Sequence, residues 1–170
     1  PRIPRSGYIS PGRVLRAAAS VPAATTMPRT TAELAELVNL SPSPCARRIR
    51  RLEQAGLITR YRAELDKLLL GLKVTLFLQV RLNQHQPQQV EAFEHAVHCM
   101  PEIIQCHSTS GRFDYLLQVV TTDIDSFEQW LRRFRQLDGV SAIDSSLATR
   151  TIKEHGPLPL TTQSSRYADK

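Results

Sequence analysis

The chain has 170 residues, of which 41% are hydrophobic, enough for one large or two small domains with packed cores. It contains no apolar run of membrane-spanning length and no charged-then-apolar signal segment, so we expect a soluble cytoplasmic protein without a membrane partner. Its three cysteines lack C-x-x-C spacing, which argues against a disulfide framework and a zinc site, and we predict neither a metal nor a cofactor.

The formal net charge of +6 is unevenly distributed along the chain. Residues 1–62 hold 11 basic and 3 acidic side chains, whereas residues 63–170 hold 11 basic and 13 acidic ones, so the net charges are +8 and −2. A basic first third on a mildly acidic remainder indicates a domain that faces nucleic acid, attached to a domain of another kind.

The first thirty residues are predicted to hold one short helix. Residues 1–10 show no periodicity and are expected to form a loose arm. Residues 11–21 are predicted to form a first helix, with Val14, Leu15 and Ala18 facing inward. This helix would complete the small bundle that a helix-turn-helix needs for its core.

The second helix is predicted over residues 31–38. Thr30 and Glu33 have the spacing of a capping box, in which each side chain bonds the other residue's backbone N–H. Asn39 begins a three-residue turn to the next helix, and asparagine tolerates the left-handed conformation that such a turn needs. A helix, a short turn and a second helix together favour a helix-turn-helix.

Residues 41–56 read as that second helix of the motif. Ser41 or Ser43 can cap its start, the two prolines are tolerated in its first turn, and Gly56 suits its end. At about 100° per residue the apolar and basic side chains separate onto two faces. The apolar face holds Cys45, Ile49 and Leu52, the opposite face holds Ser43, Arg47, Arg50, Arg51 and Gln54, and Arg48 lies on the flank.

The arginine face predicts contact with phosphates and base edges of double-stranded DNA. The alternative is a merely solvated charged face, but Glu53 is the single acid and the usual alternating salt-bridge pattern is absent. After Gly56, residues 57–65 alternate in the manner of a strand pair and resemble a wing. The predicted DNA-binding residues are Ser41, Ser43, Arg47, Arg48, Arg50, Arg51, Arg60 and Arg62.

Residues 1–65 are therefore predicted to form a winged helix-turn-helix domain, and residues 66–73 a hinge. The rest shows two strand–helix–strand units, ending in a tail at 156–170. The order β-α-β-β-α-β over 74–155 predicts an α+β chain whose second domain is ferredoxin-like. The expected strands are 74–82, 103–110, 113–121 and 140–153, and the expected helices are 87–100 and 123–137.

Each predicted helix of the second domain has an inward face, and the first helix should bury Val90, Phe93, Val97 and Met100. The second helix, with Asp125 and Glu128 at capping-box spacing, should bury Ile124, Phe127, Leu131 and Phe134. The first strand buries its even positions. Its other side carries Thr75, Phe77 and Gln79, and an exposed phenylalanine there favours a partner sheet and hence a homodimer.

The hairpin turn at residues 110–114 is a candidate binding site. Gly111 and Asp114 are common in turns for backbone reasons alone, and plain turn chemistry is one interpretation of the segment. In the alternative, Ser110, Gly111, Arg112 and Asp114 bind an amino acid: Asp114 holds the α-ammonium group, while backbone amides and Arg112 hold the α-carboxylate.

Three segments resemble the leucine-responsive regulator/AsnC (Lrp/AsnC) family of bacterial and archaeal transcription factors. Leu34-Ala35 is similar to the family's E-L-A segment, and residues 40–58 resemble its recognition-helix signature almost position for position. Cys106-His107 and residues 111–117 are similar to its effector-domain hairpin. Asn39 replaces a common glycine, the first helix lacks the family's acidic start, and the loop after it looks several residues longer.

The resemblance covers about residues 31–155 and implies a regulator, not an enzyme, whose second domain dimerises, often assembles into octamers and binds small amino acids between dimers. It also favours a ligand role for the hairpin turn. One alternative is an architectural DNA binder that senses nothing. Another is a small-molecule enzyme with His107 or Asp114 as base, which leaves the arginine helix unexplained.

Overall fold

The computed structural model describes residues 30–154 and 156. The predicted arm, the first helix at 11–21 and nearly all of the tail lie outside the described residues. The chain divides into two compact units, one containing the described residues up to Ala63 and the other spanning Glu64–Ile152.

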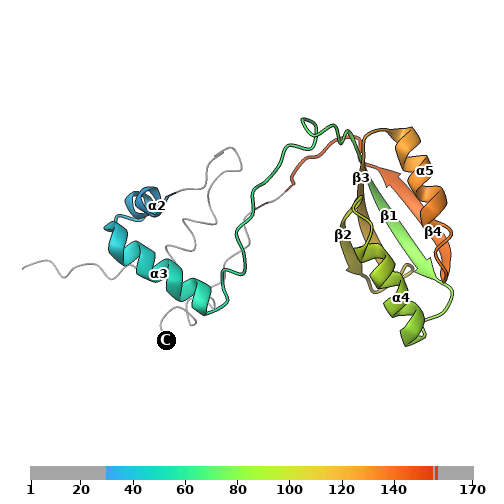
Figure 1. Ribbon diagram of the computed structural model, residues 1–170, viewed down its shortest axis with the longest axis horizontal. Coiled ribbons are helices and arrows are strands. Elements are labelled where there is room, and N and C mark those ends of the chain that lie inside the picture. The colour runs from blue at the N-terminus through green and yellow to red at the C-terminus, as the bar shows by residue number, and fades with distance from the viewer. Residues whose placement is uncertain (1–29, 155, 157–170) are drawn as a thin grey trace, which may run out of the picture. The chain divides into compact units, whose positions relative to one another are not determined.

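Two helices, α2 (Thr31–Leu37) and α3 (Pro42–Gln54), form the described part of the first unit (Figure 1). The predicted capping box of α2 is present: the Glu33 N–H donates to Thr30 Oγ1 at 3.3 Å, and the Thr30 N–H donates to Glu33 Oε2 at 2.8 Å. Asn39 has a φ of 54°, which confirms the left-handed turn between the helices. Among the described residues of this unit, Ala35, Val38, Cys45 and Leu52 form a buried core.

The end of α3 is a Schellman motif. Gly56 has a φ of 70°, its N–H donates to Glu53 O at 3.0 Å, and the Leu57 N–H donates to Leu52 O at 2.9 Å. Leu57 is half-buried against the core of the unit, as its place after the glycine predicts. The motif therefore fixes both the length of the helix and the direction of the chain beyond it.

The predicted wing strands are wrong, because residues 57–65 form no strand. Only Leu57 and Ile58 pack on the core, and residues 59–65 are exposed. The segment has no second strand to pair with among the described residues of its unit, and an isolated strand leaves its backbone groups unpaired.

In the hinge, Asp66 Oδ1 accepts the N–H groups of Leu68 and Leu69 at 2.8 and 3.1 Å and begins a turn that ends at Gly71.

The second unit is a four-stranded antiparallel sheet with the order β2-β3-β1-β4, which confirms the ferredoxin-like prediction. The strand β1 is central, and its Leu78 lies opposite Leu117 on one side and Ser145 on the other. The elements are β1 (Val74–Leu82), α4 (Pro87–His98), β2 (Ile103–Ser108), β3 (Tyr115–Thr121), α5 (Ile124–Phe134) and β4 (Val140–Leu147).

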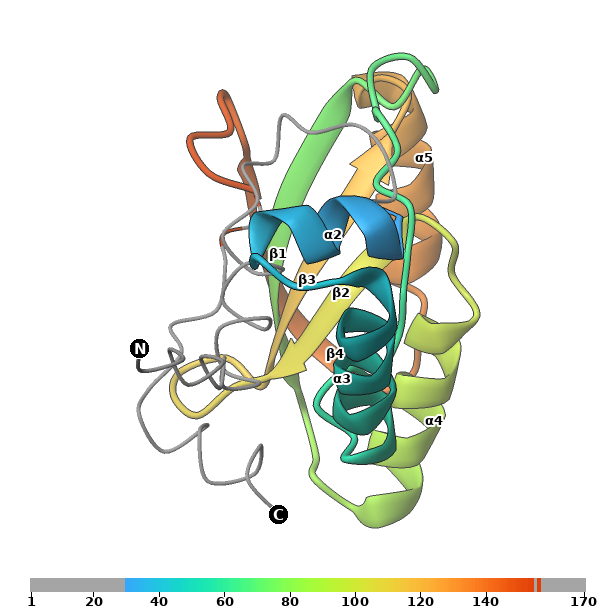
Figure 2. The same ribbon diagram turned by 90° about the vertical axis from the view of Figure 1, so that its left-hand side faces the viewer.

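Both helices of this unit cover the same face of the sheet (Figure 2). The predicted even positions of β1 and the inward residues of α4 pack there; fully buried members include Leu78, Val80, Phe93 and Phe134. On the other face of β1, Phe77 keeps 40% of its surface exposed. One face of the sheet therefore forms the core, and neither helix covers the other.

Several boundaries differ from the prediction, and three of the differences are informative. The helix α5 begins after Asp123, whose carboxylate accepts the Ser126 N–H at 2.7 Å, so the predicted cap at Asp125 is wrong. The strand β4 ends at Leu147, opposite Leu76 of β1, and only one further backbone hydrogen bond, from the Ala148 N–H to Thr75 O at 2.9 Å, continues the pairing. The turn between β2 and β3 spans residues 109–114 and is longer than predicted.

Candidate DNA interface and effector site

The outer face of α3 is a continuous polar surface. Ser43, Arg47 and Arg50 are exposed, as are Arg51 and Gln54, while Cys45 and Leu52 on the opposite face are almost completely buried. The structure therefore places the predicted face on the surface of its unit, where the arginine side chains can reach a groove of DNA.

Arg48 differs from the other arginines of this helix because it is half-buried. Its Nη1 atom has no hydrogen-bond partner within the described part of the chain. The side chain lies near Cys45: burial raises the pKa of that thiol, while the charge of Arg48 acts to lower it. Arg48 thus borders the apolar seam, as its predicted place on the flank implies.

The start of α3 is suited to an anion. Ser41 is the N-cap residue, but its side chain makes no capping hydrogen bond, which corrects the prediction of a serine cap. A cap accepts from the second or third helical N–H, and Pro44 at the third position has none. The first turn contains no acidic residue, so the positive end of the helix dipole is not neutralised locally.

The segment after α3 is tied to the helix by Tyr61. Its hydroxyl donates to Glu53 Oε1 at 2.8 Å, and this bond to a carboxylate raises the pKa of Tyr61. Arg60 and Arg62 on either side are exposed. Sequence periodicity gives no sign of the Tyr61–Glu53 contact, yet the contact engages the single acid of the helix and holds two arginines next to its end.

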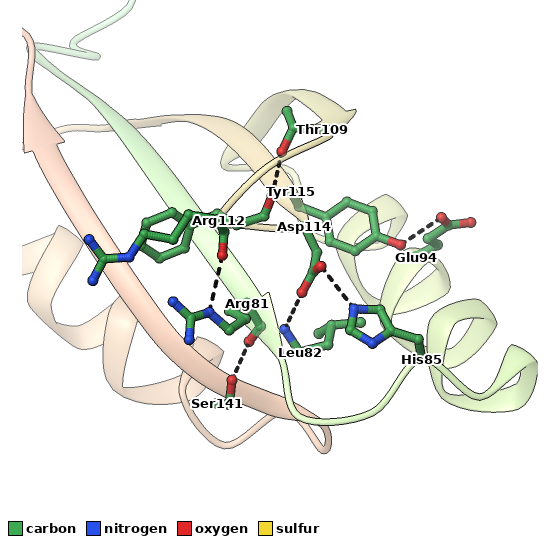
Figure 3. Close-up of polar contacts among 10 residues, drawn as sticks. Arg81, Leu82, His85, Glu94, Thr109, Arg112, Asp114, Tyr115 and Ser141 are labelled. Carbon is green, nitrogen blue, oxygen red and sulfur yellow. Dashed lines mark hydrogen bonds and ion pairs between the residues drawn. The ribbon is translucent and has the colours of Figure 1, made fainter.

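The turn at residues 109–114 is closed by its own hydrogen bonds (Figure 3). The Thr109 N–H donates to Asp114 O, and Thr109 Oγ1 donates to Phe113 O, both at 2.8 Å. Gly111 has a φ of 142°, which favours glycine, and Ser110 is exposed beside it. The backbone amide of Asp114 donates to Val80 O at 2.9 Å and joins the turn to β1.

The Asp114 carboxylate is already paired. It accepts the Leu82 N–H at 2.7 Å through Oδ2 and contacts His85 Nε2 at 2.8 Å through Oδ1. The hydrogen bond from His85, followed by that from Leu82, lowers the pKa of Asp114 below its ordinary value. His85 lies 29 residues earlier in the chain, so sequence reasoning missed it.

Arg112 and Asp114 do not converge, contrary to the geometry expected for one amino-acid site. The guanidinium groups of Arg112 and Arg81 project to one side of the turn, and the Asp114 carboxylate points to the other, toward His85 (Figure 3). The carbonyl of Arg112 accepts a hydrogen bond from Arg81 Nε at 3.1 Å. Arg81 is therefore a second residue of this site that sequence reasoning missed.

The enzyme alternative names His107 or Asp114 as a base, and the Asp114 carboxylate is already paired with Leu82 and His85. His107 is exposed on β2, and the described residues contain no group of three or more histidine, cysteine or acidic side chains placed to hold a metal. Tyr115 donates its hydroxyl to Glu94 Oε1 at 2.9 Å, and burial together with this bond raises the pKa of Tyr115 to about 12. Such a phenol stays protonated and is a structural hydrogen-bond donor.

An arginine-faced helix-turn-helix joined to a ferredoxin-like domain defines a DNA-binding regulator with a separate ligand-binding domain. Residues 29–59 match the family described as winged helix-turn-helix DNA-binding, and residues 75–158 match the Lrp/AsnC ligand binding domain. The chain belongs to the Lrp/AsnC family of transcriptional regulators.

Two relatives illustrate the family. The proline dehydrogenase transcriptional activator of Rhodobacter capsulatus is 40% identical over 72% of this chain and 80% of its own length. The leucine-responsive regulatory protein of Escherichia coli K12 is 35% identical over 77% of this chain and 80% of its own length. No helix in the part of the chain that the structure describes has the length and apolar character of a membrane span.

Two solved structures are similar in fold to most of this chain. A transcriptional regulator from Neisseria meningitidis, solved in complex with L-Met, superposes with a TM-score of 0.80 at 31% identity, over 90% of this chain and 96% of its own. An AsnC family regulator from Agrobacterium tumefaciens gives a TM-score of 0.77 at 32% identity, over 88% and 94% of the two chains.

Proposed function

We propose that this regulator binds double-stranded DNA through α3 and alters that binding when its second unit binds a small amino acid. The observation that carries the DNA-binding half is the exposed arginine face of α3, placed by the left-handed turn at Asn39. Ser41 and Ser43 at the start of the helix, with Arg60 and Arg62, supply contacts to phosphates. Arg47, Arg50 and Arg51 contact base edges, and Arg48 supports them from the flank.

Replacement of Arg47 by alanine tests the helix face. We expect Arg47→Ala to weaken binding to an operator fragment by about 1–3 kcal/mol, because a base-edge contact of arginine has that value. Gel-shift titration at fixed salt measures the change. Arg132→Ala, at an exposed position on α5, is the matched control and should leave affinity unchanged. Equal affinities of the Arg47 variant and the wild type would exclude this face from the interface.

For the effector, the relative from Neisseria meningitidis was solved with bound L-Met, which supports an amino-acid ligand. We place the ligand at the turn of Ser110, Gly111, Arg112 and Asp114, where the backbone is held to β1 and the guanidinium group of Arg112 projects away from Asp114. A thermal-shift screen of the amino acids, followed by gel shifts with each ligand that stabilises the protein, tests the proposal. An architectural DNA binder would show no stabilising ligand.

We further propose a homodimer formed through the open face of the sheet, with larger assemblies such as octamers built on it, acting in the cytoplasm where its DNA partner lies. The exposed side chain of Phe77 supports the choice of this surface.

The chain is not proposed to be an enzyme. A general base works best with a pKa near the operating pH, so a carboxyl would need a raised pKa. The hydrogen bond from His85 instead lowers the pKa of Asp114.

A further inference from the structure

Two arginines share one aromatic ring at the end of β1. The guanidinium carbons of Arg81 and Arg112 each lie 5.5 Å from the centroid of the Phe113 ring. The Arg81 Nε–H also donates to the Arg112 carbonyl at 3.1 Å, so the two residues are fixed to each other although they are 31 positions apart. Figure 3 shows both guanidinium groups projecting to the same side.

No carboxylate of the described residues lies within ion-pair distance of either guanidinium, although the charge of Arg81 is a minor cause of the lowered pKa of Asp114. Within residues 30–154, neither Arg81 nor Arg112 forms an ion pair. The nearest carboxylate along the chain, Asp114, is bonded to Leu82 and His85 and points the other way. Two like charges held beside one ring repel each other, and a bound anion would remove that repulsion.

The chemistry of the pair is that of a carboxylate site. Arginine presents planar, parallel N–H donors that match the two oxygens of a carboxylate, and stacking on an aromatic ring keeps the guanidinium plane oriented. One arginine suffices for the α-carboxylate of an amino acid. The second guanidinium can then pair with a second carboxylate on the same ligand, while the ring of Phe113 contacts the methylene groups between them.

We propose that Arg81 and Arg112 form a subsite for two carboxylates, so the effector of this regulator is an amino acid with an acidic side chain. The inference rests on the proposed amino-acid response and names the ligand class for that site. A neutral amino acid would leave one guanidinium without a partner, and its affinity would be lower by the strength of one charge-assisted pair.

The test is calorimetric titration of the full chain with L-glutamate and L-aspartate, each compared with its near-isosteric amide, L-glutamine or L-asparagine. We expect one acid to bind about tenfold or more tightly than its amide. The amide cannot form the charge-assisted hydrogen bonds that the second carboxylate forms with a guanidinium, and losing such bonds lowers affinity by about that factor. Arg81→Gln and Arg112→Gln should each remove this preference, because a single remaining guanidinium can pair with only one carboxylate. Arg132→Gln, at an exposed position on α5, should behave as the wild type.

Each other outcome has a distinct meaning, provided that thermal unfolding shows the variants to be folded. If neutral amino acids bind as tightly as acids and the two variants bind them normally, the subsite is overturned, but the amino-acid response stands. If no amino acid binds the wild type, both proposals are overturned. If Arg112→Gln weakens binding to DNA without ligand and leaves glutamate affinity intact, the pair contacts DNA, and the subsite is overturned.

Discussion

At the scale of single residues, Asp114 fastens the turn of the second unit to β1. Its backbone N–H donates to Val80 O, and its carboxylate accepts from Leu82 N–H and contacts His85. A residue that makes contacts on both its main chain and its side chain controls where the adjoining side chains project. Arg112 is two residues away, so the position of Asp114 determines the orientation of the arginine pair.

The lowered pKa of Asp114 predicts a pH dependence of stability. A carboxyl whose pKa is lower in the folded state than in the unfolded chain stabilises the fold above its unfolded pKa, about 3.9, and this contribution disappears as the pH falls through the folded pKa. We therefore expect Asp114→Asn to be less stable than the wild type at neutral pH. The difference should shrink below about pH 4, as measured by urea unfolding at a series of pH values.

The matched variant for that experiment is His85→Gln. His85 is the largest cause of the pKa shift, and the Leu82 N–H remains when it is replaced. The dependence on Asp114 should become smaller in the His85→Gln background without vanishing. A stability difference between wild type and Asp114→Asn that stays constant down to pH 2 would contradict the role of the pair.

At the scale of elements, the sequence predicted those segments whose burial repeats with a regular period. The strand β1 and the helix α4 were predicted correctly, because each has one face against a single core. The arginine face of α3 could likewise be predicted from sequence, since all its residues lie on one helix. Arg81 and His85 were not readable as site residues, because only the pairing of β1 with β3 brings them to the turn.

The failures occurred where local alternation was not matched by a tertiary partner. Residues 57–65 alternate, but no described strand lies beside them, and they remain irregular. In α5, the predicted inward residues Phe127 and Phe134 are buried, but Ile124 is 45% exposed, and Trp130, which was not among the predicted inward residues, is 2% exposed. Ile124 is the first residue of the helix, whereas Trp130 stacks on Phe134 with a centroid distance of 4.8 Å. The helix therefore packs along an aromatic seam centred nearer Trp130.

Replacement of Trp130 tests how much the packing of this aromatic seam contributes to the stability of the fold. We expect Trp130→Ala to lower the free energy of unfolding by about 3–5 kcal/mol, because it removes a buried ring and leaves a cavity. Trp130→Phe should cost much less, since it keeps the stacking and removes an indole N–H that has no partner in the described part of the chain. Ile124→Ala is the exposed control. A cost for Ile124→Ala as large as that for Trp130→Ala would mean that Ile124 packs against the core, as the sequence predicted.

At the scale of the whole molecule, a regulator with one recognition helix per chain gains specificity by pairing. Two copies related by a two-fold axis present two recognition helices to half-sites that lie one or more helical turns apart. The open face of the sheet is the surface we propose for that pairing, and Phe77 is its exposed aromatic residue on the central strand. Pairing of two second units would therefore determine how two first units meet DNA.

A charge placed on this face should separate the copies. We expect Phe77→Glu to convert the protein to a monomer at micromolar concentration, because a dimer would bury an unpaired carboxylate in each copy. Light scattering measures the mass, and binding to a two-half-site operator should weaken in parallel. Ile124→Glu is matched in chemistry and exposure, 45% against 40% for Phe77, but lies at the start of α5 and should remain dimeric. If Phe77→Glu keeps the mass of the wild-type assembly, the copies associate through another surface. If the wild type is itself a monomer, the open face is not an interface between copies.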